Sequence, residues 1–156
     1  MPIEIERKFL VKGDFRKDVI KSKKVVQAYL STQKGHTVRA RILGDKAYLT
    51  IKGPTSTSGT TRFEFEKEIT IQEAQGLIGL CKDQVIDKVR HYVPAGDHVF
   101  EVDEFHGDNE GLIVAEIELS EEDDAFEHPS WLGDEVTGQH QYYNSMLLKH
   151  PFKDWE

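Results

Sequence analysis

The sequence predicts an α+β fold that is mainly β, built on an antiparallel sheet. Eight short runs are rich in β-branched and aromatic residues, and turn signals such as Gly44-Asp45 and Pro94-Ala95-Gly96-Asp97 separate several of them. The connections are short, which favours hairpins between antiparallel strands. With 156 residues and neither a repeat nor a linker, the chain is expected to form one domain over residues 1–156.

The predicted strands follow one another along most of the chain. They span Pro2–Val11, Val25–Thr32, Thr37–Leu43, Lys46–Lys52, Arg62–Thr70, Ile86–Val93, His98–Phe105 and Leu112–Leu119. Between two of them, Gly53–Thr61 is rich in Thr and Ser and is predicted to be a flexible surface loop.

Helices are predicted at four places. Thr70-Ile71-Gln72-Glu73 is a capping box, and apolar residues follow at helical spacing as far as Cys81, so a helix is expected to cover one face of the sheet. Asp14 is the predicted N-cap of a short helix that carries Phe15, Val19 and Ile20. Ser120–Phe126 and Gln141–His150 are the other two predicted helices.

Composition limits the partners and the compartment. A formal net charge of −8 argues against nucleic acid as the main partner, because phosphate backbones bind net-basic surfaces. No apolar run is long enough for a membrane span or a secretory signal, so no membrane partner and a cytoplasmic location are expected. Cys81 is the single cysteine, which excludes an intrachain disulfide, and the His and Cys spacings give no support to a structural zinc site.

Charged residues recur at a spacing of two along the predicted strands, which places them on one face of the sheet. The opposite faces are apolar. Most of the charged sets carry a single sign: Arg39 with Arg41, Lys88 with Arg90, Glu64 with Glu66, Glu101 with Asp103, and Glu116 with Glu118, while Glu4, Glu6 and Lys8 share one face and Lys52 shares a face with Thr50. One solvated face is the simpler interpretation of such a sheet, but solvated faces usually mix charges, and like charges on neighbouring strands are destabilising. The sorting by sign therefore indicates a function.

If the sheet curls so that these faces point toward one another, each set of charges favours binding of a ligand of the opposite sign. Clustered carboxylates repel one another unless a divalent cation such as Mg²⁺ neutralises them. Clustered Arg and Lys call for a polyanion, and the guanidinium fork suits phosphate. Together the two sets predict a site for a metal–polyphosphate complex. The chain contains no Gly-x-x-x-x-Gly-Lys-Ser/Thr sequence, so a P-loop does not hold the phosphate.

Glu4-x-Glu6-x-Lys8 resembles the signature of the CYTH family, also called triphosphate tunnel metalloenzymes. Segments that resemble further family motifs follow in the family's order and cover most of residues 1–145: Val38–Arg41, Leu49–Lys52, Arg62–Glu66, Lys88–Arg90, Phe100–Asp103 and Ala115–Glu118. The tail Gly133–Thr137, with Tyr142 and Asn144, resembles the family's closing motif, and the chain is most similar to the compact bacterial members.

The resemblance implies a closed, eight-stranded antiparallel tunnel with a charged interior, whose apolar faces pack outward against a few helices. It implies that the triphosphate is bound by Lys8, Arg39, Arg41, Lys52, Lys88 and Arg90. It also implies that Glu4, Glu6 and Glu118 hold Mg²⁺ or Mn²⁺, and that Glu64, Glu66, Asp103 and Glu116 complete the acidic side or a second metal position. Glu6, Glu118 and Lys88 are the expected catalytic residues, with Lys88 either a general base or a plain phosphate ligand.

The function expected from this resemblance is hydrolysis of inorganic triphosphate to pyrophosphate and phosphate. A class IV adenylate cyclase, a thiamine triphosphatase and a non-catalytic polyphosphate-binding module are the alternatives. The chain has Gln139, His140 and Gln141 where related sequences commonly have an Asp and an Arg, which leaves open the shape of the tunnel mouth and the group attached to the triphosphate. Family members often dimerise, so a homodimer is a further possibility.

Overall fold

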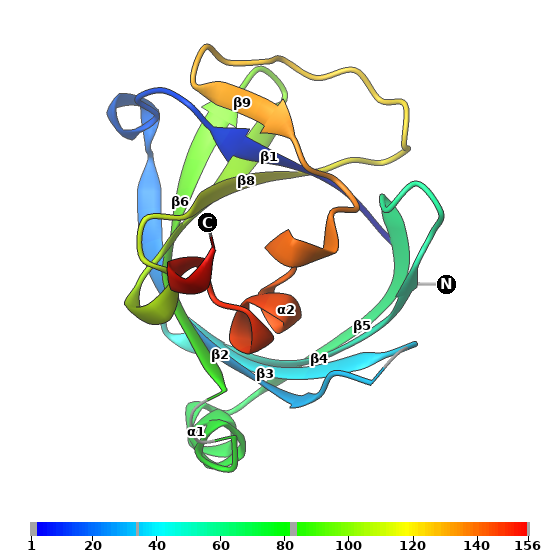
Figure 1. The fold of residues 1–156 in the computed structure, drawn as a ribbon, viewed down its shortest axis with the longest axis vertical. Helices are drawn as coiled ribbons and strands as arrows, with labels where there is room; N and C mark the ends of the chain where they lie inside the picture. The colour runs from blue at the N-terminus through cyan, green and yellow to red at the C-terminus, as the bar shows by residue number, and fades with distance from the viewer. Residues whose placement is uncertain (1–2, 34, 82–83, 156) are drawn as a thin grey trace.

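The computed structural model describes residues 3–33, 35–81 and 84–155. In it β1 to β8 form an antiparallel barrel in the order β5-β4-β3-β2-β6-β7-β8-β1, and a further pairing of β1 with β5 closes it (Figure 1). The strands are β1 (Ile3–Val11), β2 (Lys21–Ser31), β3 (Thr37–Leu43), β4 (Lys46–Thr55), β5 (Thr61–Ile69), β6 (Val85–Ala95), β7 (His98–Phe105) and β8 (Ile113–Glu118). The predicted closed barrel of eight antiparallel strands is confirmed, although Pro2 lies outside the described residues.

Strand β1 closes the barrel because it pairs with different strands along its length. Its first residues pair with β5, as in Glu4 with Arg62, while Glu6 to Leu10 pair with β8. From Phe9 to Val11 it also pairs with a short ninth strand, β9 (Leu132–Glu135). Sequence reasoning missed β9, which has only four residues, one of them a glycine, and no apolar alternation of its own.

The outer face of the barrel carries the larger hydrophobic core. Phe9, Phe100 and Ile117 are buried there, because their positions alternate with inward-facing charged residues. Trp131, which is 2% exposed, and the half-buried Phe126 cover them from the segment between β8 and β9. We expected helices over the apolar faces, but an irregular segment and β9 provide this cover.

The predicted helix at Ser120–Phe126 is wrong. In the structure Asp124 Oδ2 accepts hydrogen bonds from the backbone N–H groups of Ser120 and Glu121, both at 3.0 Å. A side chain that captures nearby backbone donors in this way competes with a helix. Phe126 then packs on Phe9 and Phe100, which draws the chain across the barrel wall instead of into a helical turn.

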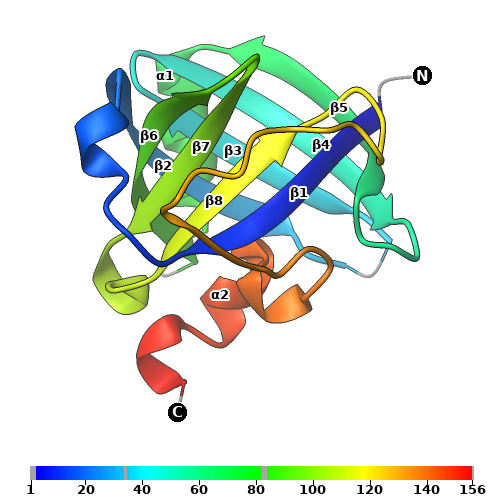
Figure 2. The same cartoon turned by 90° about the horizontal axis from the view of Figure 1, so that it is seen from above.

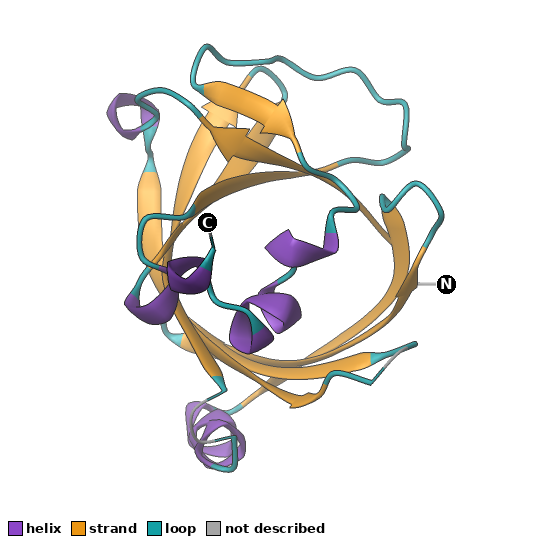
Figure 3. Cartoon of the chain, in the orientation of Figure 1, coloured by secondary structure: helices purple, strands orange, loops and turns teal. Residues whose placement is uncertain are grey.

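The capping box is confirmed and begins helix α1 (Ile71–Gly79). Thr70 Oγ1 accepts from the Glu73 N–H at 3.0 Å, and the Glu73 carboxylate accepts from the Thr70 N–H at 2.9 Å. Ala74 is fully buried where α1 packs on β2, β3 and β4, outside the barrel (Figure 3). At the other short helix, Asp14 Oδ1 accepts from the Arg16 N–H, but only a 3₁₀ turn, Arg16–Asp18, follows.

The C-terminal segment lies across one end of the barrel (Figures 1 and 2). It contains 3₁₀ turns at His140–Tyr142 and Phe152–Asp154 on either side of α2 (Asn144–Lys149), so the predicted helix at Gln141–His150 is confirmed only in part. Leu147 is fully buried against a smaller apolar cluster inside this end of the barrel, which consists of Ile86, Phe105, Leu112 and Val114. None of the helices in the described residues is long and apolar enough to cross a membrane.

Candidate functional site

Most of the charged strand positions predicted from the sequence face the barrel interior and line one cavity of about 260 Å³. The cavity is lined by Glu4, Glu6, Lys8, Tyr29, Thr37, Arg39, Arg41, Thr50, Lys52, Thr55, Gly59, Thr60, Arg62, Glu64, Glu66, Lys88, Arg90, Glu101, Glu116, Glu118, Tyr143, Asn144 and Ser145. Strand alternation explains the arrangement, because every second residue of a barrel strand points inward. The interior is therefore charged, as predicted.

One wall of the cavity is basic. Arg39 and Arg41 on β3 and Lys88 and Arg90 on β6 are all buried, with relative exposures between 1% and 9%. Burial, together with the neighbouring charges of Arg39 and Arg90, lowers the pKa of Arg41 to about 10. Because cations crowded in this way destabilise one another, the wall favours an anionic ligand.

Two buried atoms of this wall have no hydrogen-bond partner among the described residues. They are the Nε groups of Arg39 and Arg41. A buried donor that is left unpaired costs free energy, so buried donors are normally satisfied. Ligand oxygens in the cavity, or shifts of these side chains toward a ligand, would relieve that cost.

The opposite wall is acidic. Glu6 on β1 lies directly across from Glu118 on β8, and Glu116 lies across from both Lys8 on β1 and Glu101 on β7. Burial raises the pKa of Glu6 well above its usual range, and the charge of Glu116 adds to this effect. Burial also raises the pKa of Glu118, and there the charges of Glu4 and Glu101 contribute. The carboxylates of Glu6 and Glu118 therefore hold protons more tightly than isolated ones.

Asp103 lies between two cations at the back of the basic wall. Its oxygens accept from Arg90 Nε at 2.8 Å and Arg90 Nη2 at 2.9 Å, and Lys88 Nζ is 2.7 Å from Oδ2. Burial lowers the pKa of Lys88 to about 8, although the charge of Asp103 opposes the shift. Burial would raise the pKa of Asp103, but Arg90 and Lys88 outweigh it and leave that pKa below its usual value.

The carboxylates of β5, together with Glu4 of β1, lie close to cations of β3 and β4. Glu66 Oε2 is 3.4 Å from Arg41 Nη2 and accepts from Thr50 Oγ1 at 2.9 Å. Lys52 Nζ donates to Glu4 at 2.9 Å and lies 3.3 Å from Glu64. The basic groups are thus partly neutralised from within the protein.

A family model described as the CYTH domain matches residues 2–149 of the chain. The chain belongs to the CYTH domain family. A relative from Acetivibrio thermocellus, named inorganic triphosphatase, is 46% identical over 154 residues, which cover 98% of this chain and 97% of the relative. A second protein of that name, from Nitrosomonas europaea, is 34% identical over 149 residues and covers 92% of this chain and 95% of its own length.

Solved structures support the same placement. A crystal structure of an inorganic triphosphatase is 30% identical, with a TM-score of 0.68 over 95% of each chain. A protein from Pyrococcus horikoshii is 20% identical and aligns with a TM-score of 0.58 over 76% of this chain and 80% of its own, which shows the fold alone. The CYTH fold therefore extends over the whole described barrel.

The CYTH barrel brings together all but one of the residues expected in the site. Asp103 is the exception: it is 1% exposed and does not line the cavity. The expected site residues did not include several lining residues, among them Tyr29, Arg62 and Glu101. Strand alternation placed Glu101 on the charged face with Asp103 but gave it no role, and it could also have found Arg62, which shares a face with Glu64. Asn144 and Ser145 reach the cavity from α2, for which no strand period gives a signal.

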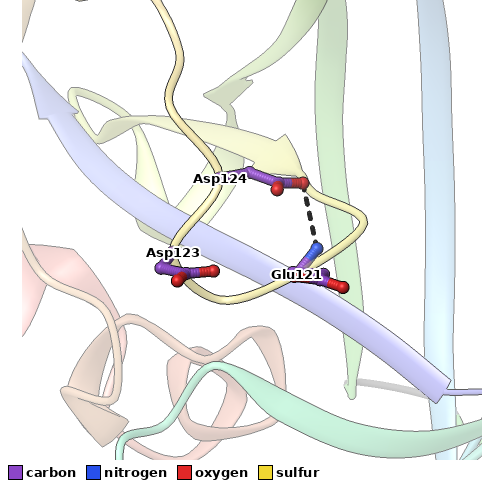
Figure 4. Close-up of side chains that lie close together, drawn as sticks. All are labelled: Glu121, Asp123 and Asp124. Carbon is purple, nitrogen blue, oxygen red and sulfur yellow. Dashed lines mark hydrogen bonds between the residues drawn. The ribbon is translucent and has the colours of Figure 1, made fainter.

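A second acidic group lies outside the cavity. Glu121, Asp123 and Asp124 cluster on the loop after β8 (Figure 4), and Asp124 already accepts from the backbone. None of these three is among the described residues that line the CYTH cavity, and Glu121 and Asp123 are exposed. This exposed cluster is therefore separate from the carboxylates that line the barrel cavity.

Proposed function

We propose that this chain hydrolyses inorganic triphosphate to pyrophosphate and phosphate, with a divalent cation bound by the acidic wall. The observation that carries the proposal is a barrel cavity with buried cations on one wall and clustered carboxylates on the other. Phosphoryl transfer depends mainly on positioning and on neutralising charge, and these two walls are suited to both. The two relatives named inorganic triphosphatase support this choice of substrate.

The basic residues are proposed to bind the triphosphate. They are Lys8, Arg39, Arg41, Lys52, Lys88 and Arg90, all of which line the cavity. Arg39 and Arg41 can each present a guanidinium fork to phosphate oxygens, whereas the lysines contribute compact charges. On binding, the phosphates would compete with Glu66 and Glu64 for the cations that these carboxylates hold.

The acidic residues are proposed to hold Mg²⁺ or Mn²⁺, and Glu4, Glu6 and Glu118 are the main candidates. Their chemistry fits, because these cations prefer carboxylate oxygens. Burial and neighbouring carboxylates raise the pKa values of Glu6 and Glu118, and a bound cation would favour their charged forms. When bound, the cation would neutralise phosphate charge and supply a nucleophilic water. Glu116, Glu64 and Glu66 also line the cavity and are proposed to complete this acidic side.

Lys88 and Asp103 are proposed to act as a unit. The ion pairs of Asp103 favour a role as the counter-ion of Lys88 and Arg90 over the metal-ligand role expected from the sequence. With a pKa of about 8, Lys88 is mostly protonated at pH 7. We therefore assign it as a phosphate ligand whose ammonium stabilises the charge that develops during transfer.

The cavity favours an inorganic triphosphate over an organic one. Its lining is almost entirely charged or polar, and among the described residues only Tyr29 and Tyr143 offer it an aromatic ring. A second hollow, near Ile20 and Val99, contains Tyr92, but Lys21 Nζ lies 4.7 Å from the centroid of that ring. An ammonium on the ring face leaves less room there for a nucleobase or another aromatic group to stack.

A substrate panel tests the proposal. Purified protein with Mg²⁺ or Mn²⁺ is given inorganic triphosphate, ATP or thiamine triphosphate, and phosphate, pyrophosphate and cyclic AMP are followed. We expect triphosphate to yield equal amounts of phosphate and pyrophosphate, much faster than the organic substrates react. The Lys8→Ala variant, purified in the same way, should be inactive. Its inactivity would exclude a contaminating phosphatase as the source of the products.

Each alternative gives its own result in this panel. Cyclic AMP from ATP would identify a cyclase, and preferential release of phosphate from thiamine triphosphate would identify an organic substrate. Binding of triphosphate without turnover of any substrate would leave a binding module and overturn the proposed hydrolysis.

A further inference from the structure

The first residue of α2 contacts the proposed phosphate-binding machinery. Asn144 Oδ1 accepts from Lys88 Nζ at 2.9 Å and from Gln27 Nε2 at 3.1 Å. Gln27 is fully buried, and Lys88 is 1% exposed. The contact therefore joins β2, β6 and the C-terminal segment inside the barrel.

The ammonium of Lys88 has three N–H donors. Asp103 Oδ2, at 2.7 Å, and Asn144 Oδ1, at 2.9 Å, are two acceptors that lie in fixed directions from it. An ammonium on a four-carbon chain is free to rotate, but two acceptors leave a single direction for the third donor. Because Lys88 lines the cavity, that donor remains available to a ligand oxygen.

The orientation of both amides follows from the chemistry of Lys88. An ammonium can only donate, so Asn144 must present its oxygen to it, and Gln27 must then present its NH₂ group to that oxygen. As a consequence, Gln27 Oε1 is buried without a hydrogen-bond partner among the described residues. A fully buried amide that leaves its own acceptor unpaired in order to orient a neighbour favours a role in the site, since purely structural amides are normally satisfied.

We propose that Asn144, oriented by Gln27, is a positioning residue that directs the Lys88 ammonium at a substrate phosphate, so that the site is complete only when α2 is seated. This inference rests on the proposed function and deepens it. Leu147, three residues further along α2, is fully buried in the apolar end of the barrel and holds the helix in place. The seating of α2 and the direction of Lys88 are thereby coupled.

Steady-state kinetics with inorganic triphosphate and Mg²⁺ test the proposal. In Asn144→Ala we expect kcat to fall by about 10- to 100-fold, because small misplacements of a catalytic group cost that much, while KM changes less than about threefold. Gln27→Leu, which keeps an apolar body of similar size, should reduce kcat by a smaller factor. Combined with Asn144→Ala it should add almost nothing, since both residues act through the same oxygen.

A conservative variant separates positioning from simple packing. Asn144→Asp keeps the acceptor oxygen, so kcat should recover most of its value, while the added negative charge in the cavity should raise KM for the polyanion. Lys149→Gln, on the exposed last turn of α2, is the matched control and should behave as wild type.

The proposal is overturned if folded Asn144→Ala keeps a kcat within about twofold of wild type, if the Asn144 and Gln27 effects multiply independently, or if Asn144→Asp is as slow as Asn144→Ala. If Asn144→Ala does not fold, Gln27→Leu and Asn144→Asp decide the question, and wild-type kcat in Gln27→Leu then counts against it. A wild-type protein that does not hydrolyse triphosphate contradicts the proposed function itself, which is a separate outcome.

Discussion

At the scale of single residues, the two faces of the barrel hold their charges differently. On the inner face, like charges crowd one another in a buried space, even though some of them, such as Arg90 with Asp103, also form ion pairs. On the outer face, opposite charges are paired: Glu104 accepts from Arg16 at 2.9 and 3.2 Å, and its Oε1 lies 3.0 Å from His91 Nε2. These bonds lower the pKa of Glu104 to about 2, with the hydrogen bond from Arg16 the largest cause. They also fix the 3₁₀ turn at Arg16–Asp18 to the barrel wall.

The interactions of Glu104 with Arg16 and His91 predict that the stability of the fold depends on pH. A carboxyl whose pKa is lower in the folded state stabilises the fold above its unfolded pKa, here 4.5, and loses that contribution as the pH falls toward 2. Glu104→Gln should therefore unfold at lower urea than wild type at pH 7, and the difference should shrink steadily between pH 5 and about pH 3. An unfolding difference that stays constant over this range would contradict the assignment.

At the scale of elements, local signals were predicted well and long-range ones were not. The Thr70 capping box and the alternation within each strand depend on neighbours a few residues away, and both were found as predicted. The irregular path of Ser120–Phe126 depends on where Phe126 packs, a contact with β1 and β7 that no local pattern reveals. The same is true of β9, which exists only because β1 offers it an edge.

For the site, too, the sequence predicted the local property, which is the strand face of each residue, but not its burial. Periodicity assigned Arg39, Arg41 and their counterparts to one face of each strand, and the resemblance to the CYTH family indicated that these faces meet. The depth of a side chain is a different property. Asp103 shares a face with Glu101, but it is buried behind Lys88 and Arg90 because the strands β6 and β7 pair there. How deeply a side chain is buried follows from tertiary packing, and the spacing of residues along a strand does not reveal it.

The seating of α2 is an element-scale property that stability measurements can test. Leu147 is fully buried among Ile86, Phe105 and Val114, so Leu147→Ala should lower the free energy of unfolding by about 2–5 kcal/mol. Leu80→Ala is the matched control: Leu80 is 73% exposed after α1, and its loss should cost less than about 0.5 kcal/mol. Urea unfolding measures both. Equal small losses would mean that α2 is not held by this contact.

At the scale of the whole molecule, the barrel encloses charges that a folded protein normally leaves in water. The chain has a formal net charge of −8, yet five of its cations, Lys8, Arg39, Arg41, Lys88 and Arg90, are buried inside. Each wall carries mainly charges of one sign, and these charges repel one another. This repulsion reduces the stability of the barrel when no ligand is bound. Two ligands of opposite charge would relieve both walls at once, and each ligand would attract the other. Ligand binding should therefore stabilise the fold cooperatively.

This cooperativity is measurable as thermal unfolding with Mg²⁺, with a triphosphate analogue whose bridging oxygens are replaced by NH, and with both together. A ligand at about 100 times its Kd adds about 2.7 kcal/mol. For a chain of this size such a gain raises the Tm by roughly 5–10 °C. We expect the two ligands together to raise the Tm by more than the sum of their separate effects.

Two matched variants locate the cation. In Glu6→Gln the increase in Tm that Mg²⁺ causes should disappear while the effect of the analogue alone remains, because only the acidic wall has changed. Glu121→Gln removes the same chemical group from the exposed acidic cluster outside the barrel and should keep the full increment. If Glu121→Gln lost the Mg²⁺ increment and Glu6→Gln kept it, the cation would bind on the loop after β8, and the proposed division of the cavity into a metal wall and a phosphate wall would be wrong.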